Sequence, residues 1–242
     1  MTTSFSVQNL SCNHGLLQAV RGISFDLIQG QVMCVIGANG AGKTTLMRAL
    51  AGAHMPADGA ILLNGKNVTR DRSFARFRSG ISMSPEGRRL FPDMTVRENL
   101  MIAAENGRPG AWTVDAVLEA FPQLKPLVNK AAGGLSGGQR QSAAIGRALL
   151  ANPDVLLLDE VSLGLSPAAI EGVYASLAEV KNNRDMIMIV VEQDLNRALG
   201  FADEIICIAE GRAELQGRPQ DFTKDQITAA YFGLKEKEPA HA

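Results

Sequence analysis

The feature that most constrains this chain is an apolar run that passes directly into a glycine-rich loop and then into a helix. Residues 31–36 read QVMCVI, an almost continuous apolar stretch typical of a strand buried on both faces of a sheet. Residues 37–44 read GANGAGKT, and residues 44–51 have a helical composition that ends at Gly52. A buried strand, a tight turn and a helix in this order predict an α/β fold with a mainly parallel sheet.

The glycine-rich loop matches the pattern G-x-x-x-x-G-K-[ST], which binds the phosphates of a nucleotide. Glycines let successive backbone N–H groups point at one concave spot, and the following helix adds its positive end. We expect Lys43 to reach the β- and γ-phosphates of ATP and the Thr44 hydroxyl to ligate Mg²⁺. An ordinary glycine turn is the alternative, but the position between a buried strand and a helix disfavours it. The expected nucleotide contacts here are Gly37, Asn39, Gly40, Ala41, Gly42, Lys43, Thr44 and Thr45.

A second apolar strand, VLLL at residues 155–158, ends in two adjacent carboxylates, Asp159 and Glu160. The carboxyl ends of parallel strands are where an α/β sheet binds its ligands. Asp159 is expected to hold the metal through its water shell, and Glu160 to polarise the attacking water. Two acids after a strand more often mark a solvated strand end. The phosphate-binding loop elsewhere in the chain is what favours catalysis.

The rest of the chain divides by periodicity into three parts. Short extended segments near the N-terminus predict a small antiparallel sheet; they cover residues 5–10, 20–27, 60–63 and 66–68. The middle third reads as helices separated by glycine and proline loops; the helices cover residues 95–105, 113–121 and 136–151. Strands and helices alternate again afterwards, with strands at 155–158, 186–191 and 204–209 and helices at 167–181 and 195–201.

This organisation predicts a single domain over residues 1–233. Its parts are a mainly parallel P-loop (RecA-like) core, an N-terminal antiparallel β subdomain and an α-helical subdomain inserted at about residues 88–150. The charged segment 234–242 is expected to be a flexible tail.

Composition excludes several classes of function. Lys+Arg and Asp+Glu nearly balance, at 24 against 25, so no nucleic-acid partner is expected. No apolar run approaches the roughly 20 residues that span a bilayer. The first residues lack the basic and apolar regions of a secretory signal, so we expect the chain to stay on the side of the membrane where it is made. The three scattered cysteines, Cys12, Cys34 and Cys207, are expected to be buried thiols.

The segment LSGGQ at residues 135–139 opens another helix with a serine and two glycines, which makes a second anion-binding helix N-terminus. In isolation it reads as an N-cap after a glycine hinge. Between the phosphate-binding loop and the acidic strand, however, it resembles the signature of ABC transporter ATPases, and the resemblance extends over about residues 4–233.

That resemblance implies a dimer. In the family, two ATPase domains pack head to tail, and each ATP lies between the phosphate-binding loop of one and the serine–glycine helix start of the other. The residues implied to serve the nucleotide of the partner are Ser136, Gly137, Gly138 and Gln139.

Within the family, three segments resemble the smaller ATPase subunit of branched-chain amino-acid importers: SPEGRRLFP at 84–92, SLGLSP at 162–167 and VVEQ at 190–193. Glu86 stands where most relatives have Gln, and Gln193 where most have His. Gln193 is expected to hold the γ-phosphate through its amide, with a catalytic role. Glu86 is expected to face Mg²⁺ or its waters, or to pair with Arg88 or Arg89 when the site is open. The alternative is that it points to solvent or to the permease and has no catalytic part.

Two other positions depart from the family. His14 lies where an aromatic ring commonly stacks on adenine; stacking and a plain surface histidine remain equally open. Val161 replaces a proline after the catalytic glutamate, which predicts a slightly less rigid loop.

The resemblance also implies partners: transmembrane permease subunits, a second related ATPase subunit or a second copy of this chain, and indirectly a periplasmic solute-binding protein. It implies a peripheral place on the cytoplasmic face of the inner membrane. Segment 86–99 would receive a permease helix on an apolar patch of Phe91, Pro92 and Met94, unless Phe91 packs the helical part onto the core.

Other functions stay open. The solute could be an aromatic acid, an amide or urea, or the chain could serve a lipopolysaccharide-type exporter. An ATPase of translation or DNA repair would carry a fused second domain or a coiled coil, which this sequence lacks. A nucleotide-gated clamp without hydrolysis is disfavoured by Glu160.

Overall fold

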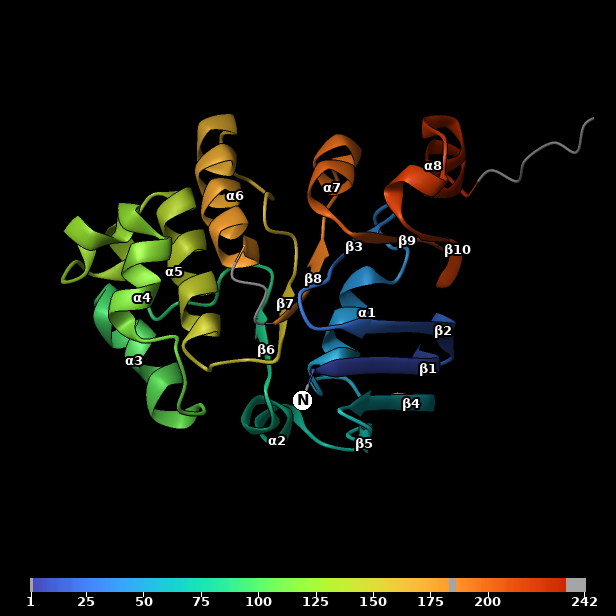
Figure 1. Ribbon diagram of the computed structural model, residues 1–242, viewed down its shortest axis with the longest axis horizontal. Helices are drawn as coiled ribbons and strands as arrows, with labels where there is room; N and C mark the ends of the chain where they lie inside the picture. The colour runs from blue at the N-terminus through green and yellow to red at the C-terminus, as the bar shows by residue number, and fades with distance from the viewer. Residues whose placement is uncertain (1, 183–185, 234–242) are drawn as a thin grey trace, which may run out of the picture.

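Two β-sheets form the frame of the protein, and helices cover the larger one (Figure 1). The computed structural model describes residues 2–182 and 186–233, so the tail expected at 234–242 lies outside the described residues. The larger sheet has the strand order β10–β9–β3–β8–β7–β6. Its neighbouring strands are parallel except for the β9–β10 pair. The expectation of a mainly parallel α/β core is therefore confirmed.

The central strands of this sheet are short and mostly apolar: β9 (Glu204–Ala209), β3 (Val32–Ile36), β8 (Ile187–Val191) and β7 (Val155–Leu158). The two edge strands are β10 (Arg212–Gly217) and β6 (Ile81–Ser84). All residues of β3, β7 and β8 are buried. This is the consequence of a sheet covered on both faces.

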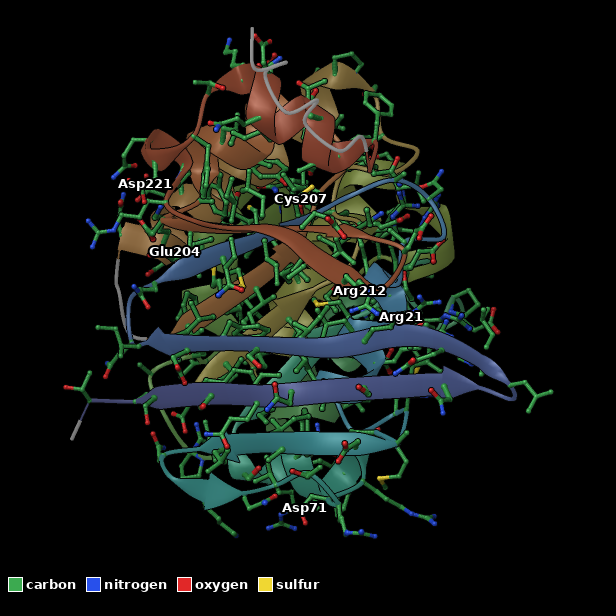
Figure 2. All side chains as sticks on the ribbon, turned by 90° about the vertical axis from the view of Figure 1, so that its right-hand side faces the viewer. Arg21, Asp71, Glu204, Cys207, Arg212 and Asp221 are labelled. Carbon is green, nitrogen blue, oxygen red and sulfur yellow. The ribbon has the colours of Figure 1, made fainter. Side chains whose placement is uncertain are left out.

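The N-terminal sheet is antiparallel, as expected, and its strands are β1 (Ser4–His14), β2 (Leu17–Ile28), β4 (Asp58–Leu63) and β5 (Lys66–Asn67). Figure 2 shows β1 and β2 lying side by side beneath β10, with Arg21 next to Arg212. The backbone N–H of Arg21 donates to the carbonyl of Gly211 at 2.8 Å. This bond joins the small sheet to the turn between β9 and β10.

Eight α-helices occur within the described residues: α1 (Lys43–Leu50), α2 (Ser73–Ser79), α3 (Val96–Asn106), α4 (Val114–Ala120), α5 (Gly137–Leu149), α6 (Pro167–Asn182), α7 (Leu195–Phe201) and α8 (Lys224–Tyr231). The chain leaves the sheet after β6, forms α3, α4 and α5, and returns as β7. These three helices form a separate group at the left of Figure 1.

Two hydrophobic clusters divide the interior. One contains the inner faces of both sheets together with α1, whose Leu46, Met47 and Leu50 are fully buried. The other joins the opposite face of the large sheet to α3, α4, α5 and α6. Because α1 is held between the two sheets, the loop that precedes it has a fixed position. Each cysteine is buried and unpaired, which confirms the expectation for the thiols.

Four elements escaped the sequence analysis: β6, α2, β10 and α8. β6 reads ISMS, and its two serines mask a buried strand. α2 centres on Arg76, whose fully buried guanidinium donates to backbone carbonyls that include those of Ala49 and Leu50 at the end of α1. No helix in the described ranges is long and apolar enough to cross a membrane.

Candidate nucleotide-binding and hydrolysis site

The phosphate-binding loop connects the end of β3 to the start of α1. The N-cap of α1 is Gly42, which offers no side-chain hydrogen bond, and the first turn contains no acidic residue. The first N–H groups of the helix are therefore left for a ligand. Lys43 is 4% exposed, and its ammonium donates to the carbonyl oxygens of Gly37 at 2.6 Å and Ala38 at 2.9 Å. Burial lowers the pKa of Lys43, while Glu160 and Asp159 act in the opposite direction.

Glycine is required at both ends of this loop. Gly42 has φ +110°, and a Cβ there would collide with the carbonyl oxygen of Ala19 in β2. Gly37 has φ +148°, and a Cβ there would collide with the carbonyl oxygen of Ile208 in β9. Strands of both sheets therefore press on the loop, and any side chain would push it out of place.

A cavity of about 220 Å³ lies over the loop and is lined by His14, Leu17, Ala19, Asn39, Gly40, Gly42, Lys43, Thr44, Thr45 and Glu160. The structure thus brings most of the predicted contacts together with the predicted catalytic glutamate. Gly37 and Ala41 are not part of the lining and are buried. Leu17 and Ala19 were missed, since two small or apolar residues in a strand carry no chemical signal.

The acidic pair follows β7 directly. Asp159 is 2% exposed, and its Oδ1 has no hydrogen-bond partner among the described residues. The Ser84 hydroxyl, at the end of β6, also has no hydrogen-bond partner among the described residues. Ser84 pairs with Leu158 of the neighbouring strand β7. Burial raises the pKa of Asp159 to about 6, and the nearby charges of Glu160 and Glu86 add to the effect. Two unpartnered oxygens at adjacent strand ends are unusual in a folded protein and point into a polar site.

Glu160 and Gln193 are in direct contact. The amide Nε2 of Gln193 donates to Oε1 of Glu160 at 3.0 Å, across 33 positions of the sequence. Glu160 has φ +51°, a left-handed backbone that is rare for a residue other than glycine. Such strain persists only where the surrounding structure enforces it. The two residues predicted to be catalytic are therefore held together at the ends of β7 and β8.

Glu86 is exposed and does not pair with either neighbouring arginine. Within the described ranges no ion pair joins it to Arg88 or Arg89, so this structure does not show that alternative, and a place beside Mg²⁺ stays a prediction. Arg88 instead donates to the Gln141 side chain of α5 at 3.1 Å and to the Leu163 carbonyl at 3.2 Å. Its backbone is left-handed, with φ +64°.

His14 lies in the cavity lining but is already in contact with protein. One ring nitrogen lies 3.1 Å from the Thr45 hydroxyl, and the ring packs on that of His54 with centroids 4.7 Å apart. His54 escaped the sequence analysis because it lies 40 positions from His14, shortly after the end of α1. Its Nε2 is buried and has no partner in the described part of the chain.

The signature segment opens α5, and its side chains form a capping box. Ser136 Oγ accepts from the Gln139 N–H at 3.3 Å, and Gln139 Oε1 accepts from the Ser136 N–H at 2.9 Å. The two glycines permit close packing, because a Cβ on Gly138 would lie 2.8 Å from Ala169 of α6. None of residues 136–139 lines the cavity over this chain's own phosphate-binding loop.

The loop after Glu160 is held by packing. Val161 is fully buried and anchors the start of this loop in the core. Glu192, directly before Gln193, is also buried, with 1% exposure. Sequence analysis gave it no role, because a carboxylate that follows an apolar strand more often marks a solvated strand end.

Comparisons with known proteins agree with this geometry. The family model described as ABC transporter matches residues 20–162. The branched-chain amino acid transport ATP-binding protein BraG of Pseudomonas aeruginosa is 36% identical over 94% of this chain and 99% of its own length. The probable counterpart LivF of Archaeoglobus fulgidus is 31% identical over 90% of this chain and 93% of its own length.

Among solved structures, a nucleotide-free ATP-binding cassette from an ABC transporter superimposes with a TM-score of 0.80. It is 25% identical in sequence, and the match covers 94% of each chain. The family model spans more than half of the chain, and the full-length relatives exceed 30% identity. This chain therefore belongs to the ABC transporter family, as one of its ATP-hydrolysing subunits.

Proposed function

We propose that this chain hydrolyses ATP to drive an importer of branched-chain or related amino acids. The observation that carries the chemistry is one cavity in which the phosphate-binding loop, with Lys43 and Thr44, faces Glu160. The solute class rests on the full-length similarity to BraG and LivF.

In this proposal the loop binds the phosphates of ATP. The free N–H groups at the start of α1 point at the phosphate oxygens, and Lys43 exchanges its two carbonyl partners for the β- and γ-phosphates. The exchange costs little, because a charged group moves from neutral acceptors to anionic ones. His14 would present its ring to the base, supported from behind by His54.

The residues present fit a Mg²⁺ ion. Asp159 Oδ1 and Ser84 Oγ are buried oxygens that lack partners within the described residues, and the Thr44 hydroxyl belongs to the cavity lining. Mg²⁺ prefers such oxygen ligands, with one or two carboxylates and the phosphates completing its shell. No cluster of three acidic, His or Cys side chains was found in the described ranges, which fits an ion shared with substrate. When bound, the ion would neutralise charge on the β- and γ-phosphates.

Glu160 would accept the proton of the attacking water, and Gln193 would orient water and γ-phosphate through its amide. Their direct contact at 3.0 Å supports this pairing. Glu86 influences Asp159 electrostatically, which supports a role beside the metal for an otherwise exposed side chain.

The site would be completed by a second subunit. Residues 136–139 do not line this chain's own cavity, so they are free to serve the nucleotide of a partner, either a related ATPase or a second copy. We also keep residues 1–233 as one ATPase domain, with the helical subdomain inserted at about 88–150.

A permease would dock beside the inserted helices. A cavity of about 370 Å³ between α2, β6 and α3 is lined by Phe74, Phe77, Met83 and Ile102 among others, and Phe74 is 61% exposed. Phe91 is 50% exposed. The buried Asn99 fixes the Phe91 backbone: it accepts from the N–H at 2.8 Å and donates to the carbonyl at 3.0 Å. Exposed aromatic side chains of this kind mark interaction sites. Docking would place the chain on the cytoplasmic face of the membrane, indirectly in contact with a periplasmic solute-binding protein.

Reconstitution tests the function. The chain should be assembled with its membrane subunits in vesicles, and ATP-dependent uptake of leucine should be compared with that of benzoate, urea and acetamide. Uptake of leucine that requires ATP and Glu160 supports the proposal. Uptake of one of the other solutes alone, or ATP-driven export of lipopolysaccharide, would replace it with the corresponding alternative.

A further inference from the structure

A buried carboxylate at the end of β8 has no part in the chemistry described so far. Glu192 is 1% exposed, and its side chain has no exposed surface. Removing a charge from water is costly unless hydrogen bonds replace the solvent. The position follows five buried residues of β8 and precedes Gln193.

Five donors surround this carboxylate. Oε1 accepts from the Ser162 hydroxyl at 2.7 Å, from the N–H groups of Gln193 at 3.0 Å and Asp194 at 3.2 Å, and from Arg197 at 3.3 Å. Oε2 accepts from the Tyr174 hydroxyl at 2.5 Å. Both oxygens of the buried carboxylate therefore have hydrogen-bond donors, four at Oε1 and one at Oε2.

The side-chain donors come from three separate elements. Ser162 belongs to the loop after Glu160, Tyr174 to α6, and Arg197 to α7. Arg197 also stacks over the Tyr174 ring at 5.4 Å. Burial and the neighbouring charge of Glu192 raise the pKa of Tyr174, so its hydroxyl remains a donor.

These contacts close a ring through the catalytic pair. Glu160 is two residues before Ser162, Ser162 binds Glu192, Glu192 is adjacent to Gln193, and Gln193 binds Glu160. A shift of the Ser162 loop therefore cannot leave Gln193 in place without breaking a hydrogen bond to a buried charge. Such bonds are among the stronger ones in proteins.

We propose that Glu192 is a positioning residue for hydrolysis: it links the loop that begins at Ser162 to Gln193 and so sets where Gln193 stands against Glu160. The link rests on the roles proposed above for Glu160 and Gln193. It makes the conformation of residues 162–166, which include the exposed Leu163 and Gly164, a determinant of catalytic geometry. Glu192 itself touches neither water nor phosphate in this scheme.

The experiment compares two hydroxyl deletions on the same carboxylate. Ser162→Ala removes the donor from the loop, and Tyr174→Phe removes the donor from α6. Both variants of the full chain should be assayed with their partner subunits for kcat, KM, ATP affinity and melting temperature. We expect Ser162→Ala to lower kcat about 5- to 20-fold with ATP affinity within about twofold of wild type, because only the orientation of Gln193 changes. Tyr174→Phe should lower the melting temperature and leave kcat within about twofold.

Four further variants complete the test. Gln193→Ala should lower kcat, and adding Ser162→Ala to it should have no further effect, because the loop acts through Gln193. Glu192→Gln should restore most of the kcat that Glu192→Ala loses, since its amide oxygen still accepts from Ser162 and the Gln193 N–H.

Three results would overturn the proposal. In the first, Ser162→Ala and Tyr174→Phe lower kcat equally, which makes Glu192 a purely structural anchor. In the second, the effects of Ser162→Ala and Gln193→Ala multiply, which removes the link between them. In the third, Gln193→Ala keeps wild-type turnover while the chain hydrolyses ATP. That outcome removes the role of Gln193 itself and is thereby distinct from a failure of the link.

Discussion

Two glycine-rich helix starts in this molecule look alike in sequence and differ in the structure. The start of α1 has no side-chain cap and lies at a cavity within its own subunit. The start of α5 has a complete capping box formed by Ser136 and Gln139 and lies outside that cavity. The first N–H groups of a helix need partners. At α1 those partners come from a ligand, whereas α5 satisfies part of the need itself.

This difference explains why one start is expected to bind nucleotide alone and the other only together with a partner. The α1 loop is pressed into position by both sheets, through Ala19 and Ile208. The α5 start packs on α6 through Gly138 and on the loop side chain of Leu165 through Gly137. It is thus a firm surface whose remaining donors face outward, since Ser136 is exposed.

The largest expected effect concerns the cavity at the start of α1, where two substitutions should separate ATP binding from ATP hydrolysis. Glu160→Gln should keep ATP affinity and lower kcat by roughly 10²–10⁴, because it removes the proton acceptor and keeps the shape. Lys43→Ala should instead weaken ATP binding, since the charged contact to the phosphates is lost. Equilibrium binding of a fluorescent ATP analogue and steady-state ATPase rates measure the two. If Glu160→Gln turned over ATP at the wild-type rate, the assigned roles would be wrong.

The second-largest expected effect concerns the start of α5, where a substitution should impair hydrolysis in the partner subunit. Ser136→Arg should leave ATP binding by its own subunit intact and lower hydrolysis at the partner's loop by about 10²-fold, because it blocks a helix start aimed at a phosphate. Mixed dimers with one Lys43→Ala subunit provide the measurement. Activity should depend on which subunit carries which lesion; indifference to that arrangement would remove the head-to-tail dimer.

A smaller effect is expected in the loop between the two starts. Arg88 of this loop contacts Gln141 of α5, while Glu86 acts on Asp159 beside the α1 loop. Glu86→Gln should leave substantial ATPase activity and change the Mg²⁺ concentration at half-maximal rate, because one negative charge near the metal is gone. Rates across a Mg²⁺ titration decide the point. Superimposable curves for the variant and the wild type would show that Glu86 does not sense the metal.

The smallest expected effect concerns the side-chain cap that α5 has and α1 lacks. Gln139→Ala should destabilise the isolated chain by about 0.5–1 kcal/mol, because half of the capping box is lost, and should leave its ATP affinity unchanged. Urea denaturation measures the first and nucleotide titration the second. Gln139→Glu is the matched control, since a carboxylate restores the box. In the dimer, however, that carboxylate should slow hydrolysis by repelling the partner's γ-phosphate.

The sequence predicted the core strands and the central motifs closely. The segments expected at 155–158, 195–201 and 204–209 are the observed β7, α7 and β9. The acids Asp159 and Glu160 indeed follow β7. These predictions succeeded for one reason. A buried parallel strand is recognised by its apolar run, and a glycine-rich loop by the backbone conformations that only glycine adopts easily.

The failures share a cause as well. The serines of β6 and the side chain of Arg76 are buried polar groups, and their burial depends on neighbours distant in sequence. Pairing with Arg88 was one of the alternatives for Glu86, but Arg88 contacts Gln141 instead, 53 positions away. Nothing local to residues 86–89 encodes that choice.

By itself, then, the sequence determined where a phosphate-binding loop, an acidic strand end and a capped glycine helix would form. Each depends on residues within one turn or one strand, so short-range sterics and hydrogen bonding decide it. Only the tertiary structure decided that Gln193 meets Glu160 and that Glu192 gathers donors from three elements. Those contacts span 5 to 33 positions and exist because buried charges must find partners wherever the packed chain supplies them.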